Sequence, residues 1–141
     1  MTERNNKIEL KKVRQADYPF LYKLLRERDP KVNISHKKLP TYQQHVKFVE
    51  SKPYSRWYVV YHRNKKVGSV YLTRQNEIGI NLKRGINEKV RYNAIELLIK
   101  MNPRQRYLGN VSPRNKKAIQ FLKNHGFKLI QYTYELGSDV V

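Results

Sequence analysis

The chain begins with a short alternating stretch, followed by two segments of helical spacing. Apolar and polar residues alternate over residues 7–13, which is typical of a strand. Apolar residues then recur three and four positions apart over residues 15–29 and again over residues 40–52. A proline directly follows each of these segments. We therefore predict one strand and two helices in this part of the chain.

Three stretches rich in β-branched and aromatic residues follow, at residues 56–62, 67–73 and 77–82. Only short polar turns separate them, so we expect an antiparallel meander of three strands. A longer helix with an apolar face then extends to residue 101. Asn87 is its expected N-cap, because an asparagine side chain accepts a hydrogen bond from the first helical turn.

The last part of the chain predicts a strand, a helix and a strand. Residues 106–111 have strand composition, and Pro113 after Ser112 is expected to open the next helix. Gly126 is a suitable residue just after the end of that helix. Residues 127–136 alternate between apolar and polar side chains, which predicts a final strand.

The resulting order, β-α-α-β-β-β-α-β-α-β, predicts an α/β fold with a mixed central sheet and helices on both faces. We expect a single domain over residues 1–141, with its core in residues 7–136 and short frayed termini. Hydrophobic residues make up 39% of the chain, which is enough for one core at this length.

The composition excludes several classes of protein. No run of eighteen apolar residues is present, which argues against a membrane span, and the N-terminus lacks the apolar region of a signal peptide. The absence of cysteine excludes disulfides, thiolate metal sites and cysteine nucleophiles. We therefore expect a cytoplasmic protein.

The strongest signal in the composition is charge. Thirty Lys and Arg residues against eleven Asp and Glu residues give a formal net charge of +19. Such a charge attracts polyanions and speeds their association. Nucleic acid, anionic membranes, nucleotide-sugars and coenzyme A are all anionic, and a general bias of the source organism toward lysine would give the same charge. The charge therefore narrows the class of partner without selecting one.

The most specific pattern lies between Tyr107 and Phe127, in YLGNVSPRNKKAIQFLKNHGF. It resembles the V-x-x-x-N-x-x-A-i-x-f-x-x-k-x-G-F segment of the GNAT N-acetyltransferases. The matching residues are Val111, Asn115, Ala118, Ile119, Phe121, Gly126 and Phe127. The upstream stretch VGSVYLTRQNEIGINL is similar to the hairpin and cofactor strand of that family. The resemblance covers residues 7–136 and implies a GNAT-like acyl-CoA N-acyltransferase fold.

The resemblance also implies where acetyl-CoA would bind. Backbone groups of Ile80, Asn81 and Leu82 would bond the pantetheine arm where two parallel strands separate. The pyrophosphate would meet free N–H groups at the start of the following helix. The other residues implied in cofactor binding are Arg84, Gly85, Ile86, Asn87, Glu88, Lys89, Val90, Arg91, Asn110, Asn115, Lys117 and Phe121. No metal is expected.

The chain departs from the family in two places. The family's loop Q/R-x-x-G-x-G/A has small residues against the phosphates, but a count from Arg84 puts Asn87 and Lys89 at those positions. Their side chains either obstruct the phosphates, or Lys89 and Arg91 bind them directly. Many members also carry a tyrosine that protonates the leaving thiolate, where this chain has Leu122. Another of the eleven tyrosines, water or the product amine would then supply the proton.

Glu77 is the implied general base, because several members of the similar family place a carboxylate at the start of this strand. A carboxylate can deprotonate the attacking amine through water. The alternative is a solvated glutamate in a turn. His36 and Tyr71 are the candidate acceptor contacts, with an exposed loop histidine and a core aromatic as the alternatives. For Asn115 the alternative is a helix cap.

Two functions from different classes remain. The first is an N-acetyltransferase that moves the acetyl group of acetyl-CoA to a primary amine, on a nucleotide-linked amino sugar or a protein. The second is a non-catalytic, basic GNAT-like module that binds nucleic acid or the ribosome. Alternating aromatics such as Trp57, Tyr58, Tyr61 and Tyr71 would fit a base-stacking platform. We favour a core role for them, because a hairpin beneath helices needs large apolar side chains.

Overall fold

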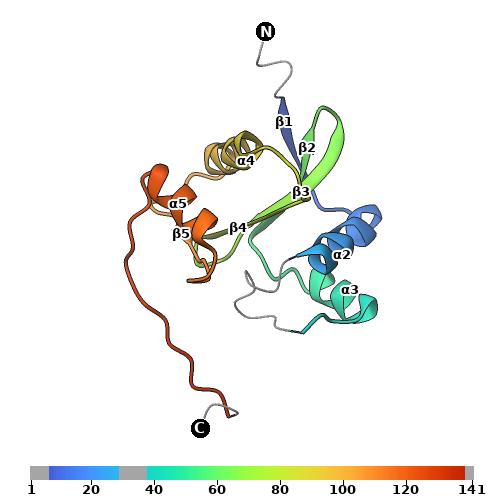
Figure 1. Ribbon diagram of the computed structural model, residues 1–141. Helices are drawn as coiled ribbons and strands as arrows, with labels where there is room; N and C mark the ends of the chain where they lie inside the picture. Colours follow the sequence, from blue (N-terminus) through green and yellow to red (C-terminus); the bar gives the residue numbers. More distant parts are fainter. Residues whose placement is uncertain (1–6, 29–37, 139–141) are drawn as a thin grey trace.

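The computed structural model describes residues 7–28 and 38–138, and a five-stranded sheet forms its centre (Figure 1). The strands lie in the sheet in their order along the chain. They are β1 (Ile8–Lys12), β2 (Arg56–His62), β3 (Lys65–Leu72), β4 (Glu77–Leu82) and β5 (Leu108–Gly109). The first four pair antiparallel and β5 pairs parallel to β4, which confirms the expected mixed sheet.

Helices cover both faces of the sheet, as expected for this α/β class (Figure 1). They are α2 (Tyr18–Glu27), preceded by the 3-10 turn η1 (Gln15–Asp17), then α3 (Tyr42–Glu50), α4 (Glu88–Met101) and α5 (Lys116–Asn124). Helices α2 and α3 lie on one face, and α4 lies on the other. None of the helices in the described ranges is long and apolar enough to cross a membrane.

The main core lies between α4 and the sheet. Val90, Ala94 and Leu98 are four residues apart, so they share the face of α4 that is buried against the strands. The strand residues that they meet are Tyr58, Val60, Val70 and Leu72. Burial of each large apolar side chain contributes about 1.5–3 kcal/mol. This cluster therefore fixes β4 and α4 in place, and both of them border the site.

A second cluster, of aromatic side chains, lies on the opposite face of the sheet beside α3. The rings of Tyr54 and Tyr71 stack with centroids 3.8 Å apart, and Trp57 meets both rings edge-on. The Trp57 indole N–H donates a hydrogen bond of 2.7 Å to Ser69 Oγ. The predicted core role is confirmed for Trp57 and Tyr71 in this cluster and for Tyr58 in the α4 core. Tyr61 is only half-buried, and Lys11 Nζ lies 4.6 Å from its ring centroid.

Several predicted boundaries agree with the structure and others differ from it. The strand expected over 67–73 is β3, Lys65–Leu72, because Lys65 and Lys66 already pair with β2. The strands at 56–62 and 77–82 and the helix after Asn87 have the expected limits. The strand expected over 106–111 is reduced to Leu108–Gly109. Helix α5 begins at Lys116 rather than at Pro113, because the side chain of Asn115 accepts the hydrogen bond of the capping position.

The final strand expected over residues 127–136 is not formed. After α5 the chain is extended and runs away from the sheet and the helices (Figure 1). We call residues 128–136 the C-terminal tail; its large apolar side chains are 63–90% exposed. The residues do alternate as a strand requires, but a strand forms only where it lies beside another strand and pairs with it. In the described part of the chain, no strand runs beside the tail.

Candidate functional site

Strands β4 and β5 pair over two positions and then separate. Glu77 lies opposite Leu108, and Ile78 lies opposite Gly109. Strand β4 continues to Leu82, whereas β5 ends at Gly109. Within the described ranges, the β5 side of β4 therefore has no partner strand after Ile78. We call this gap the β4 opening.

The register between β3 and β4 decides which backbone groups face the β4 opening. The N–H of Lys83 donates to the C=O of Val67 on the β3 side, at 2.9 Å. Successive residues of an antiparallel strand direct their backbone groups to opposite sides. The backbone of Asn81, two residues before Lys83, therefore also faces β3. The backbone groups of Ile80 and Leu82 face the opening, so only two of the three strand residues expected to offer free groups do so.

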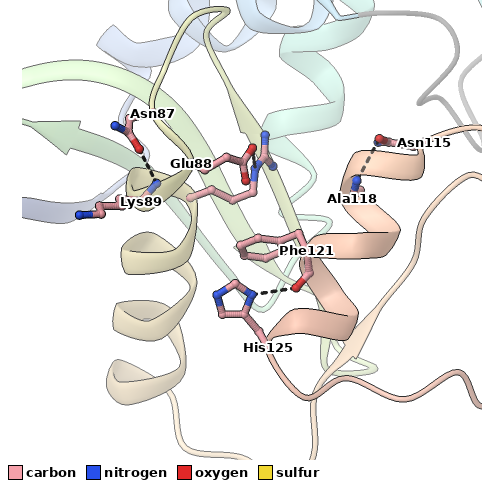
Figure 2. Close-up of polar contacts among 8 residues, drawn as sticks. Asn87, Glu88, Lys89, Asn115, Ala118, Phe121 and His125 are labelled. Carbon is pink, nitrogen blue, oxygen red and sulfur yellow. Dashed lines mark hydrogen bonds and ion pairs between the residues drawn. The ribbon is translucent and has the colours of Figure 1, made fainter.

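The N-termini of α4 and α5 lie at the same end of the two helices (Figure 2). In α4, the side chain of Asn87 accepts from the N–H of Lys89 at 2.8 Å, and in α5 Asn115 Oδ1 accepts from the N–H of Ala118 at 3.2 Å. The amide nitrogen of Asn115 has no hydrogen-bond partner among the described residues. Each helix N-terminus attracts anions, because its free N–H groups and the positive end of its dipole point outward there.

The loop before α4 makes a tight turn at its single glycine. Gly85 has a φ of +81°, in the left-handed region that favours glycine, and no atom lies within 4 Å of where a Cβ would be. The Arg84 side chain turns away from the loop and donates to the C=O of Glu27, at 3.1 Å. Arg84 therefore ties the loop to the end of α2.

The charged side chains of the first α4 turn point in different directions. Lys89 points away from α5, whereas the Glu88 side chain lies on the α5 side (Figure 2). The carboxylate of Glu88 is 3.8 Å from the guanidinium of Arg91. Partial burial lowers the pKa of Arg91 and Glu88 opposes that shift, but a guanidinium stays charged in either case. The charge of Arg91 is therefore partly neutralised by Glu88.

Two side chains of α5 fill the space between the helices. Phe121 and His125 lie on the α4 side of α5 (Figure 2), and the rings of His125 and Tyr92 have centroids 4.1 Å apart. Leu122 takes another direction and lies against Gly109, with 3.2 Å between a Leu122 methyl carbon and the place of a Cβ on that glycine. Leu122 thus packs α5 on β5, where the similar family often has a tyrosine.

Glu77 lies at the paired end of β4 and is held from two sides. The Thr73 hydroxyl donates to Glu77 Oε1 at 3.0 Å, and the Asn110 amide donates to Glu77 Oε2 at 2.5 Å. Asn110 thereby links the end of β5 to β4, just where the strands begin to part. The carboxylate is half-buried, so it is fixed in position but still reached by water.

Tyr71 covers the strand next to Glu77. It is opposite Gly79 in the β3–β4 register, and a Cβ on Gly79 would lie 1.9 Å from the Tyr71 ring. Burial, and to a smaller extent the neighbouring Tyr71, raises the pKa of the Tyr54 phenol, so Tyr54 stays neutral.

Glu77, Gly79 and Tyr71 share the face of the sheet that carries α2 and α3, because Glu77 and Gly79 are two residues apart on β4 and Tyr71 lies opposite Gly79.

The structure brings together most, but not all, of the residues expected in the site. Val90 does not belong to it, because its side chain is 4% exposed in the core and its N–H bonds to Asn87. Lys117 is exposed on the first turn of α5, and Ile86 packs on the core. His36 lies outside the described residues. In the described ranges, no three His, Asp or Glu side chains are grouped in a way that would hold a metal ion.

No protein-family model matches the sequence, and no curated protein is significantly similar to it. Solved structures do match. A domain from Methanocaldococcus jannaschii DSM 2661 has a TM-score of 0.78 and 20% identity, over 92% of this chain and 94% of that one. RimL, a ribosomal L7/L12 α-N-protein acetyltransferase in complex with coenzyme A, has a TM-score of 0.69 and 13% identity, over 88% and 81%. The fold is that of the GNAT N-acetyltransferases.

The GNAT fold is also found in a third match, an aminoglycoside N-acetyltransferase in complex with coenzyme A. It has a TM-score of 0.65 and 11% identity, over 98% of this chain and 99% of that chain. The GNAT fold that the Tyr107–Phe127 pattern implied is thus confirmed by structures of low sequence identity.

Sequence reasoning missed Thr73 and Gly79, and the only signal for Thr73 was its place four residues before Glu77 in a turn.

Proposed function

We propose that the protein is an acetyl-CoA-dependent N-acetyltransferase that acts on a primary amine. The observation that carries this proposal is the β4 opening, where the backbone N–H and C=O groups of Ile80 and Leu82 lack a partner strand. A pantetheine arm has two amides and can pair with such groups as an added strand does. Two proteins with this fold have been solved in complex with coenzyme A, which supports an acyl-CoA as the ligand.

The residues around the opening supply donors for the rest of the cofactor. The N-termini of α4 and α5 suit the diphosphate, because both present N–H groups and a positive dipole end. The free amide nitrogen of Asn115 suits a pantetheine carbonyl, while its oxygen caps α5. The cap and the ligand contact are therefore compatible roles of one side chain.

The chemistry proposed is direct transfer. Glu77 first accepts, through water, the proton that the ammonium form of the acceptor must lose. The neutral amine then attacks the thioester carbonyl, a C–N bond forms and the C–S bond breaks. The thiolate takes up the second proton, which the attacking nitrogen loses as it becomes the amide, directly or through water. The N–H of Ile80 faces the opening and would donate to the carbonyl oxygen as negative charge develops there.

The backbone donor gives a sharp test of this proposal. Ile80→Pro removes an N–H that faces the opening and takes no part in the β3–β4 ladder, which is where proline is tolerated in a strand. Ile80→Ala is the matched control, because it shortens the same side chain and keeps the N–H. We expect acetyl-CoA affinity, measured by calorimetry, to fall roughly three- to ten-fold for proline relative to alanine.

Two results would contradict the proposal. One is the absence of acetyl-CoA binding by the unaltered protein at millimolar ligand, and the other is equal affinity for both variants. Thermal unfolding of each variant shows whether it is folded.

The acceptor is proposed only by class. The similar structures include a protein α-N-acetyltransferase and an aminoglycoside N-acetyltransferase, so the shared fold admits different amines. The charge of +19 repels cationic acceptors and favours acidic ones. We propose a nucleotide-linked amino sugar or an amine of an acidic protein. Release of coenzyme A with a panel of amines tests this choice.

A second candidate function is binding of nucleic acid or the ribosome without catalysis. The specific observation in its favour is the excess of thirty Lys and Arg over eleven Asp and Glu residues. Binding of random RNA with a steep log–log salt dependence, together with no acetyl-CoA binding, would favour this candidate. A shallow salt dependence would exclude it.

A further inference from the structure

Strand β1 forms the edge of the sheet that is farthest from β5, and this edge is open. In the described part of the chain, β2 is its only partner strand. The N–H of Val13 donates to the C=O of Trp57 on the β2 side, at 3.1 Å. Successive residues of such a strand direct their backbone groups to opposite sides, so those of Ile8, Leu10 and Lys12 face outward. A further strand can therefore pair with β1 at these three residues.

An open groove lies beside this edge. Helix α4 is next to β1 (Figure 1), and the groove between them has a volume of about 510 Å³. Its lining residues are Ile8, Asn93, Glu96, Leu97, Ile99 and Lys100. The three apolar residues of this set are only half-buried, so water still reaches the apolar part of the groove. Pockets that take ligands have volumes of roughly 300–1,000 Å³. We call this hollow the β1 groove.

Two lysines lie at one end of the β1 groove. Lys12 is opposite Tyr58 in the β1–β2 register, and the Asn102 amide at the end of α4 donates to the Tyr58 hydroxyl at 3.2 Å. Lys100 comes two residues before Asn102, so Lys12 and Lys100 belong to the same end of the groove. Both lysines are exposed. An anionic group that reaches this end of the groove meets two cations.

The acidic residues nearby do not neutralise the lysine end. Glu9 follows Ile8 on β1, so its side chain lies on the opposite face of the sheet. Glu96 lines the groove, but its carboxylate accepts a hydrogen bond from the Tyr92 phenol and thereby raises the pKa of that phenol. The Tyr92 ring in turn contacts His125 of α5, on the flank of α4 away from β1. The lysine end of the groove therefore keeps its positive charge.

We infer that the β1 groove binds an acidic, extended peptide segment of a partner protein, which adds to β1 as a further strand. Alternate residues of the segment would direct apolar side chains toward Ile8 and Leu97, and an acidic residue further along the same face would meet Lys12 and Lys100. Three exposed lysines lie along residues 7–12. They oppose pairing with a second copy of the chain, which carries the same lysines, but attract an acidic segment. This inference does not depend on the acetyltransferase proposal, because β2 and β3 separate β1 from the β4 opening.

Binding of a designed peptide tests the inference. The probe is a labelled, end-blocked peptide of nine residues, with threonine at odd positions and glutamate, valine, valine and glutamate at the even ones. Either chain direction then places a glutamate at the lysine end. We expect Lys100→Glu to weaken binding, measured by fluorescence anisotropy at low salt, by roughly five- to ten-fold. Lys123→Glu on α5 makes the same change in total charge and should have little effect. The same peptide with lysine in place of glutamate should not bind.

The backbone contact has its own test. Lys12→Pro removes an outward N–H from an edge strand, where proline is tolerated, and Lys12→Ala removes the same charge but keeps the N–H. We expect roughly three- to ten-fold weaker peptide binding for proline than for alanine. In the unaltered chain, the peptide should slow hydrogen exchange at the amides of Ile8, Leu10 and Lys12. The amides of Glu9 and Lys11, which already face β2, should change little. Thermal unfolding checks that both variants are folded.

Several results would overturn the inference. They are no peptide binding at millimolar concentration, equal affinity of the Lys100→Glu and Lys123→Glu variants, and equal binding of the lysine-containing peptide. Outward β1 amides that exchange slowly without peptide, and become fast on dilution, would mean that a second copy occupies the edge. Random RNA that binds the unaltered chain and loses affinity for Lys100→Glu, where the peptide does not bind, would assign the surface to nucleic acid instead.

Discussion

Gly79→Ala tests how closely Tyr71 is packed on β4. The new Cβ would lie 1.9 Å from the Tyr71 ring, whereas carbon atoms in contact are about 3.5–4.0 Å apart. The ring must therefore move by about 1.5–2 Å. That movement separates it from Tyr54, whose ring stacks on it at 3.8 Å and is enclosed by Trp57. Overpacking of this kind costs about 1–3 kcal/mol.

Urea unfolding of four proteins provides the measurement: the unaltered chain, Gly79→Ala, Tyr71→Leu and the double variant. We expect Gly79→Ala to lower the free energy of unfolding by about 2 kcal/mol, or several degrees in midpoint temperature for a chain of this size. In the Tyr71→Leu background the same change should cost much less, with a coupling of about 1 kcal/mol or more. Equal losses in both backgrounds would refute the reasoning.

Three further predictions concern charge. Glu77→Gln keeps the size of the side chain and should lower the rate of coenzyme A release by about 10²–10⁴ with unchanged acetyl-CoA affinity; an unchanged rate would remove Glu77 from the mechanism. Glu88→Gln should raise acetyl-CoA affinity a few-fold at low salt, because it removes a negative charge from the α4 N-terminus, whereas Glu96→Gln, in the same helix but further from that end, should not. Burial alone would raise the pKa of Asp17, but hydrogen bonds from Lys66, at 2.6 Å, and from a backbone N–H hold it below its ordinary 3.8. The stability that Asp17 contributes is therefore present at neutral pH and lost as the pH falls below about 4. In urea titrations at several pH values, Asp17→Asn should flatten that acid loss, and parallel curves for both proteins would contradict this prediction.

Most of the sheet could be predicted because its signals are local. Strands 56–62 and 77–82 are rich in β-branched and aromatic residues and are bounded by turns. Asn87 signals the start of α4 in the same direct way, since its side chain caps the helix that follows. Such features depend only on neighbours in the sequence, so a single chain is enough to identify them.

The errors arise where the answer depends on distant neighbours. The length of β5 is set by how far β4 stays beside it, and residues 106–111 carry no sign of where that pairing stops. The tail has the composition of a strand, but whether it pairs depends on a partner that the sequence does not name. Tertiary context decides both cases.

The candidate site also combines features that local signals predict with features that depend on distant neighbours. Glu77, Asn115 and the α4 N-terminus are proposed from a sequence pattern, and only the register of the sheet shows that the backbones of Ile80 and Leu82, but not of Asn81, face the β4 opening. The position of the turn before β4 decides which β4 residues direct their backbone groups to β3 and which to the opening. A pattern of apolar residues cannot fix that position to a single residue.

The short junction between β4 and β5 has a mechanical consequence. The segment from β5 through the end of α5 is attached to the rest of the domain by two ladder positions, by the link between Asn110 and Glu77 and by the ring contact between His125 and Tyr92, and α5 buries no residue fully. With so few buried contacts, this segment should open at a lower free energy than the α4 core, and its amides should exchange hydrogen faster than those of α4.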